Sequence, residues 1–132
     1  MPKLPLADKS LNTRFPLLAA DDDHDDCTGV YTGKVRARVG HETILATDRL
    51  RAQAEDVSTP LLVVHARSDT MCDPEGSAYF VDRASSRDKT FVYAENIDGA
   101  DGGMWHGLTQ EPGSEAVAKH VASWLIARAG SR

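Results

Sequence analysis

The order of apolar and polar positions divides the chain into an irregular first part and a regular second part. Residues 41–57 carry apolar side chains at spacings of four, four and three, which places them on one face of a predicted helix. These positions are Ala46, Leu50, Ala54 and Val57. Residues 1–30 show no such period, because prolines interrupt any helix and the acidic run over 21–26 is too charged to bury.

Two short runs in the second part predict neighbouring strands. Leu61–Val64 is continuously apolar, which is typical of a strand buried on both faces in a parallel sheet. Thr90–Tyr93 is rich in aromatic and β-branched residues, which favour strands. Between them, Asp73 followed by Pro74 predicts a helix that continues to about Ser85. A carboxylate caps free N–H groups, and proline fits the first helical position.

A last helix is predicted from about Ser114 to just before Gly130, with Trp124 and Leu125 in the core. The second part therefore reads strand–helix–strand–helix, which predicts the α/β class with a parallel sheet and right-handed crossovers. Two strands alone do not form a stable two-sided sheet, so their apolar faces need neighbours that these 132 residues do not encode.

Composition and charge narrow the classes of function. The net charge is −5 and no basic stripe is present to neutralise phosphates, so a nucleic-acid partner is not expected. No apolar run reaches the roughly 20 residues that span a bilayer, and the first residues lack the apolar stretch of a secretory signal. Cys27 and Cys72 make neither a disulfide framework nor a zinc site, which favours a reducing compartment such as the cytoplasm.

The loops that follow the two strands carry the candidate chemistry. Asp69 lies after the first strand and His106 after the second. Functional groups in open α/β sheets collect beyond the carboxyl ends of the strands, so these two side chains are positioned to meet. A carboxylate on one imidazole nitrogen fixes the tautomer, and the other nitrogen can then take a proton from a serine hydroxyl. The order Asp before His matches the last two members of an α/β-hydrolase triad.

Several segments resemble monoacylglycerol-lipase-like α/β-hydrolases. This is the serine aminopeptidase S33 type, which includes plant lysophospholipase and caffeoylshikimate esterase relatives. Residues 60–77 resemble the acid-bearing segment of that family, and residues 104–108 its histidine loop. Residues 84–90 resemble the approach to its last strand and residues 123–125 its closing helix. Residues 31–36 resemble the tail of its lid.

The resemblance implies the C-terminal part of a serine ester hydrolase, with Asp69 as the triad acid and His106 as the general base. It implies a lid remnant over 1–40, which would help form an acyl channel and could touch a membrane surface, and a core segment over 41–132. Substrates would be monoacylglycerols or similar carboxylic esters, and no metal or organic cofactor would be required. The sequence has no G-x-S-x-G elbow for the nucleophile, so the chain alone is expected to be inactive.

Alternatives stay open for the residues and for the function. Asp73 is a rival carboxylate, although a helix cap explains it better, and His65 and His120 are interpreted as structural. His24 within the acidic run is a weak candidate for loose cation binding. Residues 94–103 read as an insertion relative to the family. The chain is alternatively an inactive truncated paralogue, or a module that binds a partner or its own copy through an exposed sheet edge.

Overall fold

The computed structural model describes residues 37–100 and 102–130, which fall into two compact units that divide between Gln53 and Ala54. The first unit contains helix α2, Ala37–Ala52. The helix predicted over 41–57 therefore begins earlier and ends earlier than expected. None of its residues is buried, and Leu50 is exposed. The apolar face expected over 41–57 does not lie on one helix, because Ala54 is buried in the short helix η2, Ala54–Asp56, which belongs to the second unit. The predicted lid lies almost wholly outside the described residues.

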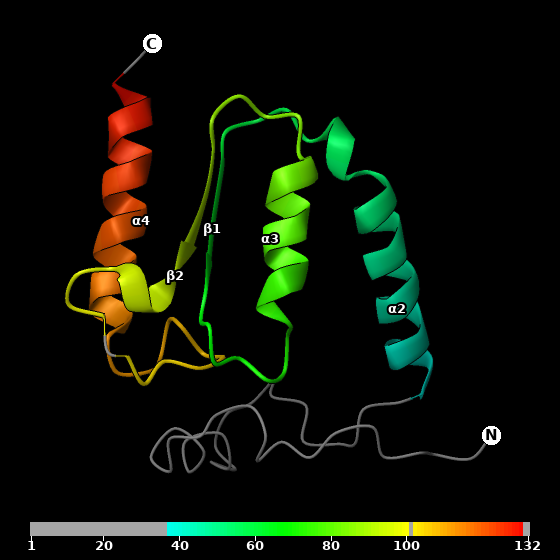
Figure 1. Ribbon diagram of the computed structural model, residues 1–132, viewed down its shortest axis with the longest axis horizontal. Coiled ribbons are helices and arrows are strands. Elements are labelled where there is room, and N and C mark those ends of the chain that lie inside the picture. Colours follow the sequence, from blue (N-terminus) through cyan, green and yellow to red (C-terminus); the bar gives the residue numbers. More distant parts are fainter. Residues whose placement is uncertain (1–36, 101, 131–132) are drawn as a thin grey trace, which may run out of the picture. The chain divides into compact units, whose positions relative to one another are not determined.

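The second unit has the predicted strand–helix–strand–helix order. It contains β1 (Leu61–His65), α3 (Pro74–Arg83), β2 (Lys89–Tyr93), the short helix η3 (Ala94–Asn96) and α4 (Ser114–Ala129). The two strands pair in parallel, from Leu61 opposite Lys89 to His65 opposite Tyr93. Helix α3 contacts both strands and α4 contacts β1, and the two helices lie on opposite sides of the strands in Figure 1. The α/β class is confirmed.

Burial of the strands is less complete than the apolar run predicts. Every residue of β1 is only partly buried, and so is every residue of β2 except the exposed Lys89. The sheet of the described residues contains these two strands alone, so their side chains keep some contact with solvent. The apolar run of β1 is typical of a central strand, but the described part of the sheet contains no strand beyond β1 and β2.

The helix boundaries follow the predicted capping signals. Asp73 accepts a hydrogen bond from the backbone N–H of Glu75 at 3.0 Å and precedes Pro74 at the first position of α3. Gly113 is the N-cap of α4 and has a φ of 94°, a left-handed conformation that suits glycine. The core assignment of Leu125 is wrong, since this side chain is 56% exposed. Val117 is the buried member of α4, and Leu125 lies away from the face that packs on the sheet.

The hydrophobic core lies beside the loops at the carboxyl ends of the strands. Its buried members come from the end of β1, from the segment after β2 and from α4. They are Ala66, Ala94, Ile97, Met104 and Val117. The segment over 94–103 thus packs into the core through Ala94 and Ile97, and it turns at Gly99 with a φ of 79°. Among the described residues, no helix is long and apolar enough to cross a membrane.

Candidate active site

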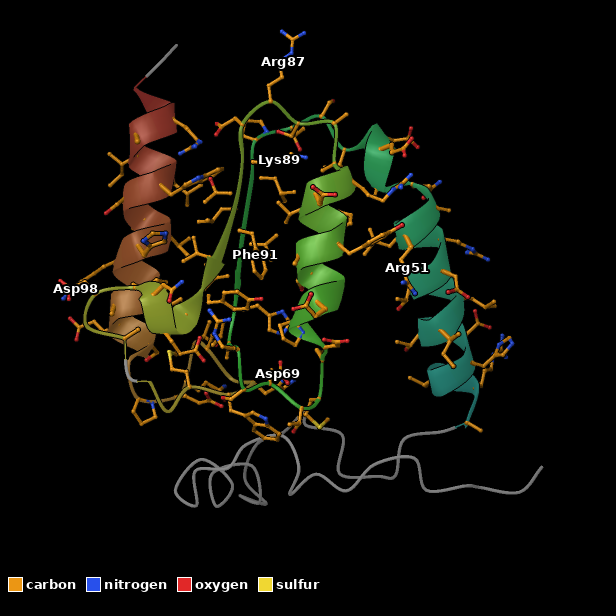
Figure 2. All side chains as sticks on the ribbon, viewed as in Figure 1. Arg51, Asp69, Arg87, Lys89, Phe91 and Asp98 are labelled. Atoms are coloured by element: carbon orange, nitrogen blue, oxygen red, sulfur yellow. The ribbon has the colours of Figure 1, made fainter. Side chains whose placement is uncertain are left out.

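Asp69 lies in a tight turn directly after β1, and its side chain is built into that turn. Its Oδ1 accepts hydrogen bonds from the backbone N–H groups of Met71 at 2.7 Å and Cys72 at 3.0 Å. This local side-chain capping of the backbone is characteristic of aspartate in turns. Asp69 is only 8% exposed, and Figure 2 shows it beyond the end of β1, beside the start of α3.

The second carboxylate oxygen of Asp69 faces two imidazoles. Nδ1 of His106 lies 3.0 Å from Oδ2, and Nε2 of His65 lies 3.1 Å from the same oxygen. The two side chains that the sequence paired, Asp69 and His106, therefore meet in the fold. The carboxylate has hydrogen-bonding partners at both oxygens, which is what a buried charge requires.

His65 was expected to be structural, and its connection to the acid was missed. Besides Asp69, its Nε2 lies 3.1 Å from the carbonyl oxygen of Cys72, and its Nδ1 lies 2.8 Å from Oγ of Ser77 on α3. Both partners of Nε2 are acceptors, so the network assigns the proton to Nε2. In the neutral ring, Nδ1 then accepts a hydrogen bond from the hydroxyl of Ser77. His65 thus connects the acid turn to α3.

The surroundings of Asp69 favour its charged form. Burial by itself raises the pKa of the Asp69 carboxyl, but hydrogen bonds from Cys72 N–H, His106 and Met71 N–H, together with the charge of His106, outweigh burial and lower that pKa. The nearby Cys72 thiol responds in the opposite direction. Burial and the negative charge of Asp69 both raise the pKa of Cys72. A protonated thiol therefore lies beside an ionised carboxylate at neutral pH.

His106 has one nitrogen engaged and one available. A carboxylate can only accept, so the proton of a neutral ring lies on Nδ1 and is donated to Asp69. Nε2 is then a lone-pair acceptor, and no group within residues 37–100 and 102–130 is hydrogen-bonded to it. The His106 side chain is 33% exposed, so the imidazole is not closed off from solvent by the described residues.

Two further hydrogen bonds join the acid turn to the histidine loop. Oγ of Ser68 donates to the carbonyl oxygen of Met104 at 2.7 Å. Nε1 of Trp105 donates to Oγ1 of Thr70 at 3.1 Å. Ser68 and Thr70 lie on either side of Asp69 along the chain, and both partners in the histidine loop directly precede His106. The relative placement of acid and imidazole therefore rests on several interactions between the two loops.

Glu111 stabilises the histidine loop through hydrogen bonds to backbone N–H groups, and this residue was not predicted from the sequence. Its carboxylate accepts hydrogen bonds from the backbone N–H groups of Trp105 at 2.5 Å, His106 at 3.1 Å and Gly107 at 2.9 Å. A glutamate five residues after a loop histidine follows no helix or strand period. The only available signal was an acidic residue in an otherwise uncharged loop between His106 and α4.

The site offers ligand atoms that could in principle hold a metal ion. Atoms of Asp69, Cys72 and His106 lie within 4.8 Å of one another. The oxygens of Asp69 are already hydrogen-bonded, and Nδ1 of His106 carries the proton that joins it to Asp69. The raised pKa of Cys72 disfavours the thiolate that a metal needs. This donor set suits proton transfer better than metal binding.

Two remaining candidates from the sequence, Asp73 and His120, are described by the structure and occupy other positions in the fold. Asp73 serves as the N-cap of α3, as its sequence context indicated. His120 lies half-buried on α4, outside the two loops. His24 and the acidic run fall outside the described residues.

Comparisons with known proteins point to one family. The model of the serine aminopeptidase S33 family matches residues 7–113. Monoacylglycerol lipase of Mycolicibacterium smegmatis is 31% identical over 98 residues, covering 74% of this chain and 32% of that protein. Caffeoylshikimate esterase of Arabidopsis thaliana is 32% identical over 98 residues, covering 72% of this chain and 27% of that protein. The chain thus spans about a third or less of the length of these curated relatives.

The fold agrees with this comparison. The crystal structure of monoacylglycerol lipase from Paleococcus ferrophilus superposes with a TM-score of 0.73 at 21% sequence identity, covering 92% of this chain and 44% of that one. The parallel pair of strands with flanking helices is therefore part of an α/β-hydrolase fold. The family match covers most of the sequence, and the chain belongs to the serine aminopeptidase S33 family of α/β-hydrolases.

Proposed function

We propose that this chain supplies the acid and the base of a carboxylic ester hydrolase, with Asp69 orienting the imidazole and His106 acting as the general base. The observation that carries the proposal is the 3.0 Å contact between Nδ1 of His106 and the buried carboxylate, which leaves Nε2 as an exposed proton acceptor. The nucleophilic serine would come from residues other than these 132, because the sequence has no G-x-S-x-G elbow.

The proposed chemistry is acyl transfer through a serine ester. A serine hydroxyl placed against Nε2 of His106 loses its proton to that nitrogen while its oxygen attacks the ester carbonyl. The ionised Asp69, whose pKa is lowered by its hydrogen bonds, stabilises the imidazolium that forms. His106 then protonates the leaving alcohol, and water attacks the acyl-enzyme in a second step that repeats the proton transfers.

The proposed substrates are monoacylglycerols or similar carboxylic esters. The similarity to two relatives named as a monoacylglycerol lipase and a caffeoylshikimate esterase supports this class. Residues 1–40 would contribute an apolar channel for the acyl chain and a region of peripheral contact with membranes. A cytoplasmic location fits the cysteine content and belongs to the same proposal.

A chimaeric enzyme tests the proposal directly. Residues 41–132 replace the matching segment of the M. smegmatis monoacylglycerol lipase, so that the relative supplies the elbow serine and the remaining strands. We expect the chimaera to hydrolyse p-nitrophenyl butyrate and to label with a fluorophosphonate, whereas the 132-residue chain alone does neither. His106→Ala and Asp69→Asn should each lower kcat by a factor of about 10⁴.

The matched control is His120→Ala, which removes an imidazole from α4 without touching the two loops. This variant should keep kcat close to that of the parent chimaera. An active chimaera in which His106→Ala retains its kcat would rule out the proposed base. Hydrolysis by the 132-residue chain alone would refute the requirement for an outside serine.

A second candidate function is an inactive chain that associates through its sheet. The described sheet contains only β1 and β2, and their side chains are partly exposed. Strand edges of this kind can pair with a partner or with a second copy. Sedimentation velocity at increasing concentration tests this function: a monomer at all concentrations argues against self-association, and a concentration-dependent dimer supports it.

A further inference from the structure

The histidine loop, residues 104–108, is hydrogen-bonded to the carboxylate of Glu111, which follows it in the chain. Glu111 is 1% exposed. One of its oxygens, Oε2, accepts the backbone N–H of Trp105 at 2.5 Å, while Oε1 accepts those of His106 at 3.1 Å and Gly107 at 2.9 Å. The backbone closes the same loop in the other direction, since the N–H of Glu111 donates to the carbonyl oxygen of Gly107 at 3.0 Å.

Three successive N–H groups that converge on one point form an anion-binding concavity, and here a side chain of the loop fills it. Hydrogen bonds to an ionised carboxylate are stronger than those to a neutral acceptor. Without Glu111, several backbone donors in a largely buried loop would lose their acceptor, which is costly. The conformation of the loop therefore depends on this carboxylate.

His106 is the middle residue of the three donors, so the orientation of its peptide group is set by Glu111. The Cα–Cβ bond of His106 follows that orientation, and the imidazole must reach Oδ2 of Asp69 at 3.0 Å. A small rotation of the peptide would break this contact. Among the described residues, the Glu111 carboxylate is hydrogen-bonded to backbone N–H groups and to neither the imidazole nor Asp69, so its influence on the pair passes through the backbone.

We propose that Glu111 is a positioning residue that holds His106 against Asp69. The inference deepens the proposed function and rests on it for its catalytic meaning. The contact between Nδ1 of His106 and Asp69 can nevertheless be measured in the 132-residue chain without any catalysis. The positioning role and the triad role can therefore fail separately.

The test compares the 132-residue chain with its Glu111→Gln variant by NMR. Glutamine keeps the size of the side chain but points an N–H₂ group at a backbone N–H. We expect amide exchange in the Trp105–Gly107 segment to be about tenfold faster, because glutamine keeps only one acceptor oxygen and at least one of the three hydrogen bonds is lost. The imidazole nitrogen shifts of His106 at alkaline pH should move away from the Nδ1-protonated tautomer. Amides of β1 and β2 should keep their protection.

Glu115→Gln is the matched control, because it removes a carboxylate that is exposed on α4 and paired with Lys119. This variant should change neither the amide exchange of the loop nor the His106 shifts. A folded Glu111→Gln variant with unchanged exchange and unchanged tautomer overturns the proposal.

If Glu111→Gln fails to fold, the Glu111→Asp variant is measured in the same way. This variant keeps the carboxylate but is shorter by one methylene. A folded Asp variant that loses the Nδ1 tautomer supports the positioning role, and one that keeps it overturns the role. Two unfolded variants would show that Glu111 stabilises the fold as a whole, which rejects a specific role.

In the chimaera, Glu111→Gln should lower kcat with little change in KM. An inactive parent chimaera contradicts the proposed function but leaves the NMR result standing.

Discussion

Nε2 of His65 lies 3.1 Å from Oδ2 of Asp69, four residues further along the chain, so the last residue of β1 folds back on the acid that follows it. The same oxygen accepts a hydrogen bond from Nδ1 of His106 at 3.0 Å. The acid is thus shared by a strand histidine, which is 13% exposed, and a loop histidine that is more accessible. The less exposed imidazole helps to hold the carboxylate in place, while the more accessible one keeps Nε2 without a hydrogen-bonding partner among the described residues.

Replacing His65 should lower the free energy of unfolding more than replacing His106. His65→Ala removes the acceptor for the Ser77 hydroxyl and one of the two donors to Oδ2 of Asp69 in a partly buried region, so we expect a loss of about 1–3 kcal/mol in the free energy of unfolding. His106→Ala removes a more exposed ring and should cost less than about 1 kcal/mol. Urea unfolding of the two variants checks the order. Equal losses would contradict the assigned roles.

Asp69 should make stability dependent on acid pH. Its folded pKa is lowered relative to the ordinary value of 3.8, so the ionised form stabilises the fold at pH values above 3.8. This contribution is lost as the pH falls through 3.8 and then through the lower folded pKa. Thermal unfolding measured across this acidic range should therefore show a steeper loss for the parent than for Asp69→Asn. Parallel curves would show that Asp69 is not linked to folding.

Cys72 should react slowly with thiol reagents although it is exposed. Burial and the charge of Asp69 raise the pKa of its thiol, which lowers the thiolate fraction at neutral pH. We expect Asp69→Asn to increase the rate of alkylation by iodoacetamide, because the repelling charge is removed. The measurement is made in a Cys27→Ser background, so that Cys72 is the only thiol. An unchanged rate in Asp69→Asn would exclude an electrostatic influence of Asp69.

The cap of α3 should contribute to the stability of the second unit. Asp73→Ala removes the acceptor for the N–H of Glu75, and we expect a loss of about 0.5–2 kcal/mol. Asp73→Asn keeps an acceptor oxygen and should cost less than the alanine variant. Chemical unfolding of both variants measures the difference. If alanine and asparagine destabilise equally, the hydrogen bond is not the source of the stability.

The fold was largely predictable because its signals are local. The continuous apolar run of β1, the Asp73–Pro74 start of α3 and the glycine after α4 each depend on a few neighbouring residues. Leu125 was misplaced because apolar character alone does not tell a central position of a helix face from one at its margin, and this residue is exposed. The apolar spacing over 41–57 continued past a break in the helix that no residue in the sequence marks.

The candidate site was predictable only in part. Asp69 and His106 follow neighbouring parallel strands, and this topology brings them together whatever the intervening sequence. The contacts of His65 and Glu111 depend on how two turns fold back on themselves. No helix or strand period and no short motif predicts such contacts, because the partners are backbone groups or residues on the opposite side of a turn. These supporting residues therefore required the structure.

The hydrogen bonds from Ser68 to Met104 and from Trp105 to Thr70 have an evolutionary consequence. They couple the acid turn to the histidine loop, so we expect a change in the shape of one loop to disturb the other. Recombination between related genes would therefore keep Asp69 and His106 together with both loops when it transfers the whole stretch from β1 to Glu111. A crossover between the two loops would separate Ser68 and Thr70 from the residues with which they form hydrogen bonds.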